Sequence, residues 1–280
     1  RRGMDELKHI QAVNIGQAMA NIPGVYSSST GNGISKPVIR GLSGMRVVTY
    51  WQGLRIENQQ WGGDHGLGMG EVGLGEVEIV KGPSSLLYGA DALGGVVYFL
   101  EEPYAAQDQI EGFVESIYDD NTQGSKNLGG LKVANNKWRL NVFGSYNNQA
   151  DFEVPSKEYV QNSRWKEQVL KASLGYHNKK YVGNLRYQFL QQRIGIPGHT
   201  HDSVVDVTTF LVDNQKRSKT IPAQTIQNHY ALWENLVHWS KNELKLLAGY
   251  TQNTLQEYEE KITIPGIDVT LSNVSLQAQW

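Results

Sequence analysis

The feature that most limits how this chain can fold is the two-residue alternation of its C-terminal part. From Gln109 onward, apolar and polar side chains alternate through segments of roughly ten residues, which short and long connections separate in turn. This pattern is typical of antiparallel sheet, either closed as an outer-membrane barrel or packed as a soluble sandwich. We expect eight strands, over 110–118, 127–134, 137–147, 166–177, 181–193, 229–239, 244–256 and 269–280.

The connections favour the barrel. Short turns are expected at 135–136, 178–180 and 241–243, and long links at 149–164 and 194–228. Short turns at one rim and long loops at the other are typical of outer-membrane barrels, whose strands turn one face to lipid and the other to the interior. We expect an apolar set of side chains to face lipid: Trp138, Leu140, Val142, Leu170, Ala172, Leu174, Leu185, Tyr187 and Phe189. A polar set is expected to face the interior: Arg139, Asn141, Lys171 and Arg186.

Composition narrows the classes of function. The chain has 280 residues, a net charge of -2 and no cysteine. A near-neutral charge gives no reason to expect a nucleic-acid partner, and the lack of cysteine removes disulfides, thiolate metal sites and cysteine catalysis. No run of about 18 apolar residues predicts a transmembrane helix, whereas alternating barrel strands average out polar. No hydrolase, metalloprotease or phosphate-loop motif occurs, so we do not expect an enzyme.

The N-terminal part is predicted to mix helix and strand. Asn14 is a candidate N-cap for a helix over 14–21, and 46–56 alternates as a hairpin would. The stretch 75–100 predicts a strand, a glycine–proline break, a capped turn and a second strand, an arrangement found in many small α+β units. One face of the expected helix is apolar: Ile15, Ala18, Met19 and Ile22.

The sequence of the stretch 75–100 resembles the signature of a known protein family. Residues 81–96 read KGPSSLLYGADALGGV, and the plug domain of TonB-dependent outer-membrane receptors usually reads close to RGPxSxLYGxxAxGGV. Lys81 replaces the common arginine and keeps its charge. Residues 39–55, IRGLSGMRVVTYWQGLR, are similar to a second plug segment, IRGxxxxRVxxxxDGxR. Gln52 stands where that segment often has aspartate, so no carboxylate role is expected there.

The resemblance implies both architecture and function. It implies an α+β plug domain at 1–106, followed at 107–280 by antiparallel transmembrane β-barrel strands. It also implies energised import across the cell outer membrane of a Gram-negative bacterium, without catalysis and with no cofactor required. The implied partners are the TonB–ExbB–ExbD complex, outer-membrane lipid, and a metal ion or metal chelate. Because eight strands leave no room for a plug of about 100 residues, we expect the barrel to be incomplete in this chain.

Two loop stretches carry residue types that bind metal. Asp64 and His65 lie side by side in a glycine-rich loop, and His199, His201 and Asp202 follow a proline–glycine bend. Imidazole and carboxylate donors without thiolate suit zinc, with copper(II) or nickel also possible. Both stretches are similar to those of zinc-uptake receptors within this family. We therefore expect these five residues to bind a divalent metal ion such as Zn²⁺ as the transported ligand, with ordinary solvated histidines as the alternative.

Several alternatives remain open at this point. The chain is also compatible with a ferric siderophore, haem or cobalamin receptor, or with a passive or adhesive barrel. A sugar or peptide importer that pairs with a surface lipoprotein is less favoured, because 87–95 departs from the usual LYGSRxANGV. The basic run 216–219 is expected to be solvated, although it would suit lipopolysaccharide or a ferric siderophore. Aromatic side chains that would stack on a ligand are Trp51, Trp61, Tyr88 and Tyr98, with packing favoured for the two tyrosines.

Overall fold

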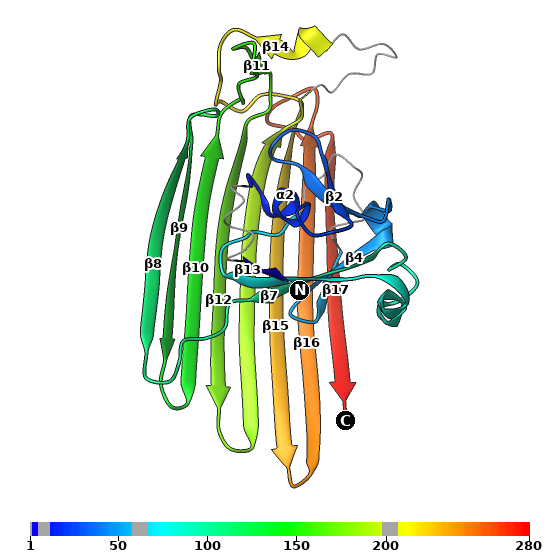
Figure 1. Cartoon of the computed structure of the whole chain (residues 1–280), viewed down its shortest axis with the longest axis vertical. Helices are drawn as coiled ribbons and strands as arrows, with labels where there is room; N and C mark the ends of the chain where they lie inside the picture. Colours follow the sequence, from blue (N-terminus) through cyan, green and yellow to red (C-terminus); the bar gives the residue numbers. More distant parts are fainter. Residues whose placement is uncertain (1, 5–11, 58–66, 198–206) are drawn as a thin grey trace.

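The computed structural model describes residues 2–4, 12–57, 67–197 and 207–280. The N-terminal residues form a compact unit with a five-stranded mixed sheet, and the C-terminal residues form a curved antiparallel sheet of eight long strands. The N-terminal unit lies against one face of the long sheet, which we call the wall (Figure 1). Among these residues, no helix is both long and apolar enough to cross a membrane.

The five-stranded sheet of the N-terminal unit has the order β1-β6-β7-β4-β5. Its strands are β1 (Arg2–Gly3), β4 (Val47–Trp51), β5 (Leu54–Ile56), β6 (Leu74–Val80) and β7 (Gly95–Glu101). Strand β4 runs parallel to β7, and the other neighbours are antiparallel. A separate hairpin joins β2 (Val25–Ser29) to β3 (Ser35–Ile39). The helical elements are α2 (Ile15–Met19), η1 (Gly44–Arg46) and η2 (Gly82–Tyr88).

Local sequence signals account for these elements. The Asn14 side chain accepts a hydrogen bond from the Gln17 backbone N–H at 3.0 Å, which caps α2 as predicted. The apolar side of α2 is buried, so the predicted helix face is confirmed. Between β4 and β5, Gln52 and Gly53 both adopt positive φ angles of 51° and 90°, as a two-residue hairpin turn requires.

The wall has the order β17-β16-β15-β13-β12-β10-β9-β8, and every pairing is antiparallel. The predicted class, a mixed α+β unit followed by antiparallel barrel-type strands, is therefore confirmed. The strands are β8 (Ile110–Asp119), β9 (Gly124–Ala134), β10 (Trp138–Gln149), β12 (Trp165–His177), β13 (Tyr181–Gly195), β15 (Ala223–Trp239), β16 (Asn242–Tyr258) and β17 (Ile267–Gln279). Above the wall, β11 (Tyr159–Val160) pairs with β14 (Leu211–Val212), and η3 (Val207–Phe210) precedes β14 (Figure 1).

The predicted strand starts were wrong at the loop end of the wall. Strand β15 begins at Ala223 instead of residue 229, and β9 begins at Gly124 instead of residue 127. The early part of β15 carries Gln224 and Asn228 on its covered face, both fully buried. Because polar side chains there are buried by neighbouring protein, their polarity does not indicate a solvated loop. The second long connection is accordingly shorter than predicted and runs over 196–222.

The two faces of the wall differ as the alternation predicts. On the outer face, Trp138 and Leu185 are 50% and 56% exposed. On the inner face, which the N-terminal unit covers, Asn141 and Lys171 are 1% and 0% exposed. The predicted separation of the apolar and polar sets is confirmed. The main apolar core also crosses between the two layers, because Tyr230, Leu232 and Leu247 of the wall join the core of the N-terminal unit.

Candidate functional site

All five residues predicted to bind metal lie outside the described residues. Asp64 and His65 fall in 58–66, and His199, His201 and Asp202 fall in 198–206. Within the part of the chain that the structure describes, no group of three or more histidine, cysteine or acidic residues is arranged to hold a metal ion. The predicted metal site therefore remains a prediction.

The described flanks of both stretches lie near the same end of the wall. Leu67, Gly68 and Met69 line a small cavity together with Gly33 and Trp165. A Cβ placed on Gly33 would come within 2.7 Å of Ile194, two residues before the second connection begins. Gly68 is also fixed in place, because its carbonyl accepts a hydrogen bond from the Asn228 side-chain amide at 2.9 Å. The chain thus enters both stretches from a shared, well-packed region.

The middle of the interface between the two layers depends on a buried lysine. The Lys171 ammonium group, on the inner face of β12, donates to the Gly70 carbonyl at 3.0 Å. Nearby, Lys126 of β9 forms an ion pair with Glu71 of the N-terminal unit. Side chains of the wall therefore hold the segment that leads into β6, one at a backbone carbonyl and one at a side chain. Each contact replaces a hydrogen bond to water that this segment would otherwise make.

Two glycines let that backbone approach the wall closely. A Cβ on Gly70 would lie 2.4 Å from a methyl group of Val169. A Cβ on Gly73 would lie 2.5 Å from the ring of Phe143, and Gly73 also has a φ of +70°. Any side chain at either position would push the N-terminal unit away from the wall.

The end of β7 carries the strongest charge contacts between the layers. Glu101 accepts hydrogen bonds from Arg186 at 2.7 Å and from the Ser173 hydroxyl at 2.6 Å. Arg186 also pairs with Glu234 of β15 at 2.9 Å. Side-chain exposure is 1% for Glu101 and 11% for Arg186, so solvent screens this pair little.

Tyr104 packs against the same cluster. The Arg139 guanidinium lies 4.7 Å from the centre of its ring, and that of Arg186 lies 5.7 Å away. Burial raises the pKa of the Tyr104 hydroxyl, so this side chain is a neutral phenol at physiological pH. The sequence alternation identified Arg139 and Arg186 as inward-facing, but it carried no signal for their partners Tyr104 and Glu101.

Three of the four candidate ligand-stacking aromatics pack within the protein. Trp51 has 0% exposure and its ring centre lies 6.2 Å from that of Tyr230. Tyr98 stacks on Tyr50 at 5.8 Å, and Tyr88 meets Tyr50 edge-on at 5.3 Å. The packing prediction is confirmed for Tyr88 and Tyr98, and Trp51 is buried within the protein as well. Trp61 lies outside the described residues.

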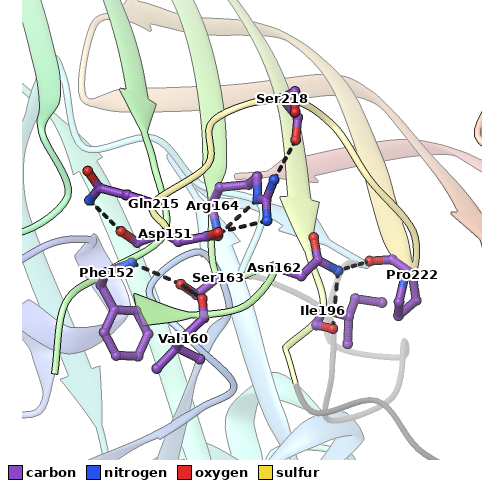
Figure 2. A network of polar contacts seen from close by, with 10 residues as sticks. All are labelled: Asp151, Phe152, Val160, Asn162, Ser163, Arg164, Ile196, Gln215, Ser218 and Pro222. Atoms are coloured by element: carbon purple, nitrogen blue, oxygen red, sulfur yellow. Dashed lines mark hydrogen bonds and ion pairs between the residues drawn. The ribbon is translucent and has the colours of Figure 1, made fainter. Parts of the chain in front are cut away.

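A buried polar network fixes the long connections at the loop end of the wall (Figure 2). Arg164 and Asp151 form a two-pronged ion pair, with N–O distances of 2.9 and 2.7 Å, and Arg164 also donates to the Ser218 carbonyl at 2.8 Å. The Asn162 amide donates to the Pro222 carbonyl at 2.6 Å. The connection before β12 therefore holds the connection before β15.

Comparison with known proteins identifies the N-terminal unit. The family model for the TonB-dependent receptor plug domain matches residues 3–96. These residues form a TonB-dependent receptor plug domain. The matched residues include both motifs described above, α2 and most of the five-stranded sheet, whose strand β7 continues to Glu101.

Two relatives are similar to the chain in sequence. It is 29% identical over 174 residues to a vitamin B12 transporter of Vibrio vulnificus, covering 60% of this chain and 28% of the relative. It is 39% identical over 99 residues to a heme/hemopexin utilization protein of Haemophilus influenzae, covering 35% of this chain and 13% of the relative. The chain thus matches less than a third of the length of either relative.

Solved structures share the whole arrangement of plug and wall. A siderophore receptor of Acinetobacter baumannii aligns with 98% of this chain and 43% of its own, at 17% identity and a TM-score of 0.66. An iron transporter of Neisseria meningitidis aligns with 95% of this chain and 42% of its own, at 12% identity and a TM-score of 0.70. At these identities the similarity establishes the fold: a plug covering one face of part of a receptor barrel.

Proposed function

We propose that this chain takes part in TonB-dependent import of a scarce nutrient across the outer membrane of a Gram-negative bacterium. The observation that carries the proposal is the polar interface of the plug with the inner face of the wall. It is built from side chains that bond to main-chain carbonyls, as Lys171 does to Gly70 and Asn228 to Gly68. Water can replace the neutral contact of Asn228 at a net cost of about 0.5–1.5 kcal/mol and the charged contact of Lys171 at about 1.5–3 kcal/mol, so these contacts can be broken one at a time. A partner that supplies energy, the TonB–ExbB–ExbD complex, would drive that displacement.

The test separates energised import from a passive or adhesive barrel. Uptake by cells that carry the full-length receptor should stop when TonB is deleted or the proton gradient is collapsed, while surface binding of the nutrient persists. A passive pore would keep transporting under both treatments. An adhesive barrel would show no uptake under any condition.

For the cargo, we propose a divalent metal ion such as Zn²⁺, bound by Asp64, His65, His199, His201 and Asp202. The support is chemical: tetrahedral zinc takes about four donors, and these residues supply imidazoles and carboxylates in a chain without cysteine. Neither stretch alone provides a complete shell, so binding would join plug to loop. The imidazoles bind metal in their neutral form, so affinity should fall as pH drops through about 6.5.

Calorimetric titration of the full-length receptor tests this cargo. We expect wild type to bind Zn²⁺, and His65→Ala and the pair His199→Ala/His201→Ala each to weaken binding. Equal binding by wild type and variants would contradict the metal site.

A second cargo, a ferric siderophore, haem or cobalamin, is supported by the two sequence relatives, a vitamin B12 transporter and a heme/hemopexin utilization protein. The same titration with cyanocobalamin, haemin and a ferric siderophore distinguishes the two proposals. Binding of one of these chelates, with no binding of Zn²⁺, would favour the second cargo.

A further inference from the structure

A cavity at the loop end of the wall concentrates positive charge. It has a volume of about 160 Å³. Its lining includes five cationic side chains and no carboxylate: Arg164, Lys166, Arg193, Arg217 and Lys219. Two of these belong to the basic run 216–219, which the sequence led us to expect as solvated; Lys219 is instead half-buried.

Only one of these charges is balanced by an acid within the described part of the chain. Arg164 pairs with Asp151. Lys166 and Arg193 are direct cross-strand partners, and like charges in that position repel. The Lys219 ammonium lies 3.6 Å from the centre of the Tyr258 ring, and burial, followed by the nearby charge of Arg193, lowers its pKa. The cavity therefore has a surplus of positive charge that an anion would relieve.

The cations are held in place by the protein itself. The Ser218 and Pro222 carbonyls are bound by Arg164 and Asn162, which fixes the backbone on both sides of Lys219 (Figure 2). The Arg217 guanidinium donates to the Asn148 carbonyl at 3.0 Å and to the Gln123 carbonyl. An anion entering this cavity would meet donors already in position, so little ordering entropy opposes binding.

The strand positions place two of the cations on the outer face of the wall. On β12, Lys166 lies on the same face as Leu170, which is 46% exposed, and on β13, Arg193 lies on the same face as Leu185, which is 56% exposed. Lys171 of β12 lies on the opposite face and points inward to the plug. On β13 the apolar outer residues run from Tyr181 to Phe189, about 27 Å along the strand, which at the 35–45° tilt of barrel strands is about 20 Å of height and fits within the roughly 25 Å lipid-facing band of a barrel. Arg193 lies beyond that band, at the level expected for lipid headgroups.

We propose that this cavity binds a phosphate group of a lipopolysaccharide molecule in the outer leaflet of the membrane. Arginine and lysine together suit phosphate, since guanidinium donors form paired hydrogen bonds and an ammonium adds a mobile point charge. Lys166 and Arg193 reach the cavity from the outer face of the wall, so they are separate from a ligand path through the interior. The inference goes beyond import, although it rests on the outer-membrane location proposed above.

Binding of bis-phosphorylated lipid A to the purified full-length receptor in detergent tests the proposal. The variant is Lys166→Gln/Arg193→Gln, because neither side chain forms an ion pair with a carboxylate in the described residues. The matched control is Lys179→Gln/Lys180→Gln, which removes two exposed charges from the opposite end of the same hairpin. We expect the variant to lose about ten- to hundredfold in affinity and the control to match wild type. Heat-modifiable gel mobility confirms that each protein is folded.

Two further probes identify the source of the phosphate. Lipid A stripped of its phosphates should bind as weakly as the double variant binds the intact lipid. Inorganic phosphate at the same concentration should fail to displace lipid A. Equal affinity of variant and wild type, an equal loss in the control, or displacement by inorganic phosphate would each overturn the proposal. The assay needs neither TonB nor cargo, so its failure is distinct from a failure of import.

Discussion

At the scale of single residues, the plug depends on charge held where little water reaches. Arg186 forms ion pairs with both Glu101 and Glu234. Glu101→Gln keeps an acceptor for Ser173 but removes the charge, so we expect a loss of about 1–3 kcal/mol in plug stability. Arg186→Leu leaves the buried carboxylate of Glu101 and the half-buried carboxylate of Glu234 without their cation, so we expect a loss of about 3–5 kcal/mol in plug stability.

Amide hydrogen exchange over 95–104 in the full-length receptor measures both losses. Glu115→Gln is the control, since Glu115 is exposed on β8, and its effect should stay within about 0.5 kcal/mol. If Arg186→Leu is no more damaging than Glu101→Gln, the ion-pair account is wrong.

Gly73 tests close approach at a single position. Gly73→Ala imposes a side chain at a φ of +70° and brings it against Phe143, so we expect a loss of about 1–3 kcal/mol. In a Phe143→Ala background the steric part should disappear while the backbone strain remains, which a double-mutant cycle in thermal unfolding would show. Gly144→Ala is the control, because a Cβ there meets only an ordinary contact at 3.8 Å. Equal cost in both backgrounds would contradict a steric contact with Phe143.

Single-residue roles were predictable only in part. The alternation of apolar and polar residues in β12 and β13 was enough to predict that Lys171 and Arg186 face inward. Their partners, Gly70 and Glu101, lie 101 and 85 positions away in the chain, and no local pattern encodes a contact over that separation. The five predicted metal ligands, all outside the described residues, stay a prediction.

At the scale of elements, the cost of placing a charge on the outer face of the wall should depend on its depth in the bilayer. Leu185 lies midway between Tyr181 and Phe189, so Leu185→Arg should cost about 2–4 kcal/mol on insertion into a bilayer. Gln191→Arg, on the same face but near the rim, should cost about 0–1 kcal/mol. Folding of the full-length receptor into phospholipid vesicles, titrated with urea, measures both. Equal costs would show that these strands do not lie across a bilayer at the predicted depth.

Elements were the part of the fold that sequence predicted best. All eight wall strands, the capped helix and the hairpin turn at Gln52-Gly53 follow from periodicity and turn chemistry. The starts of β9 and β15 did not, because the wall extends past the apolar band into polar residues; at the start of β15 both faces are buried. There the strand carries residues such as Gln224, whose burial depends on the neighbouring strands and loops.

At the scale of the whole molecule, the proposed import would require the plug to move against the wall. The chain contains no cysteine, so an engineered pair can be introduced cleanly. A Cβ on Gly70 would lie 3.2 Å from the Cβ of Val169, close to the roughly 3.5–4.5 Å of disulfides. We expect Gly70→Cys/Val169→Cys to bind cargo but to stop uptake when oxidised, and to recover on reduction. Val169→Cys alone and the reduced pair are the controls, and uptake by the oxidised pair would show that this part of the plug stays in place.

The strand order of the plug gives it a mechanical polarity. Strand β1 is an edge strand held to β6 by two residue pairs, whereas β7 lies at the centre of the sheet and its last residue, Glu101, is tied to the wall. A pull applied through β1 would unzip its pairs one after another at low force. Strand β7 would resist the same pull better, because it is paired with a strand on each side and its Glu101 is held by the ion pair. The plug would therefore unfold first at β1 while β7 stays attached to the wall. Strand β7 would then be the template on which the rest of the sheet refolds.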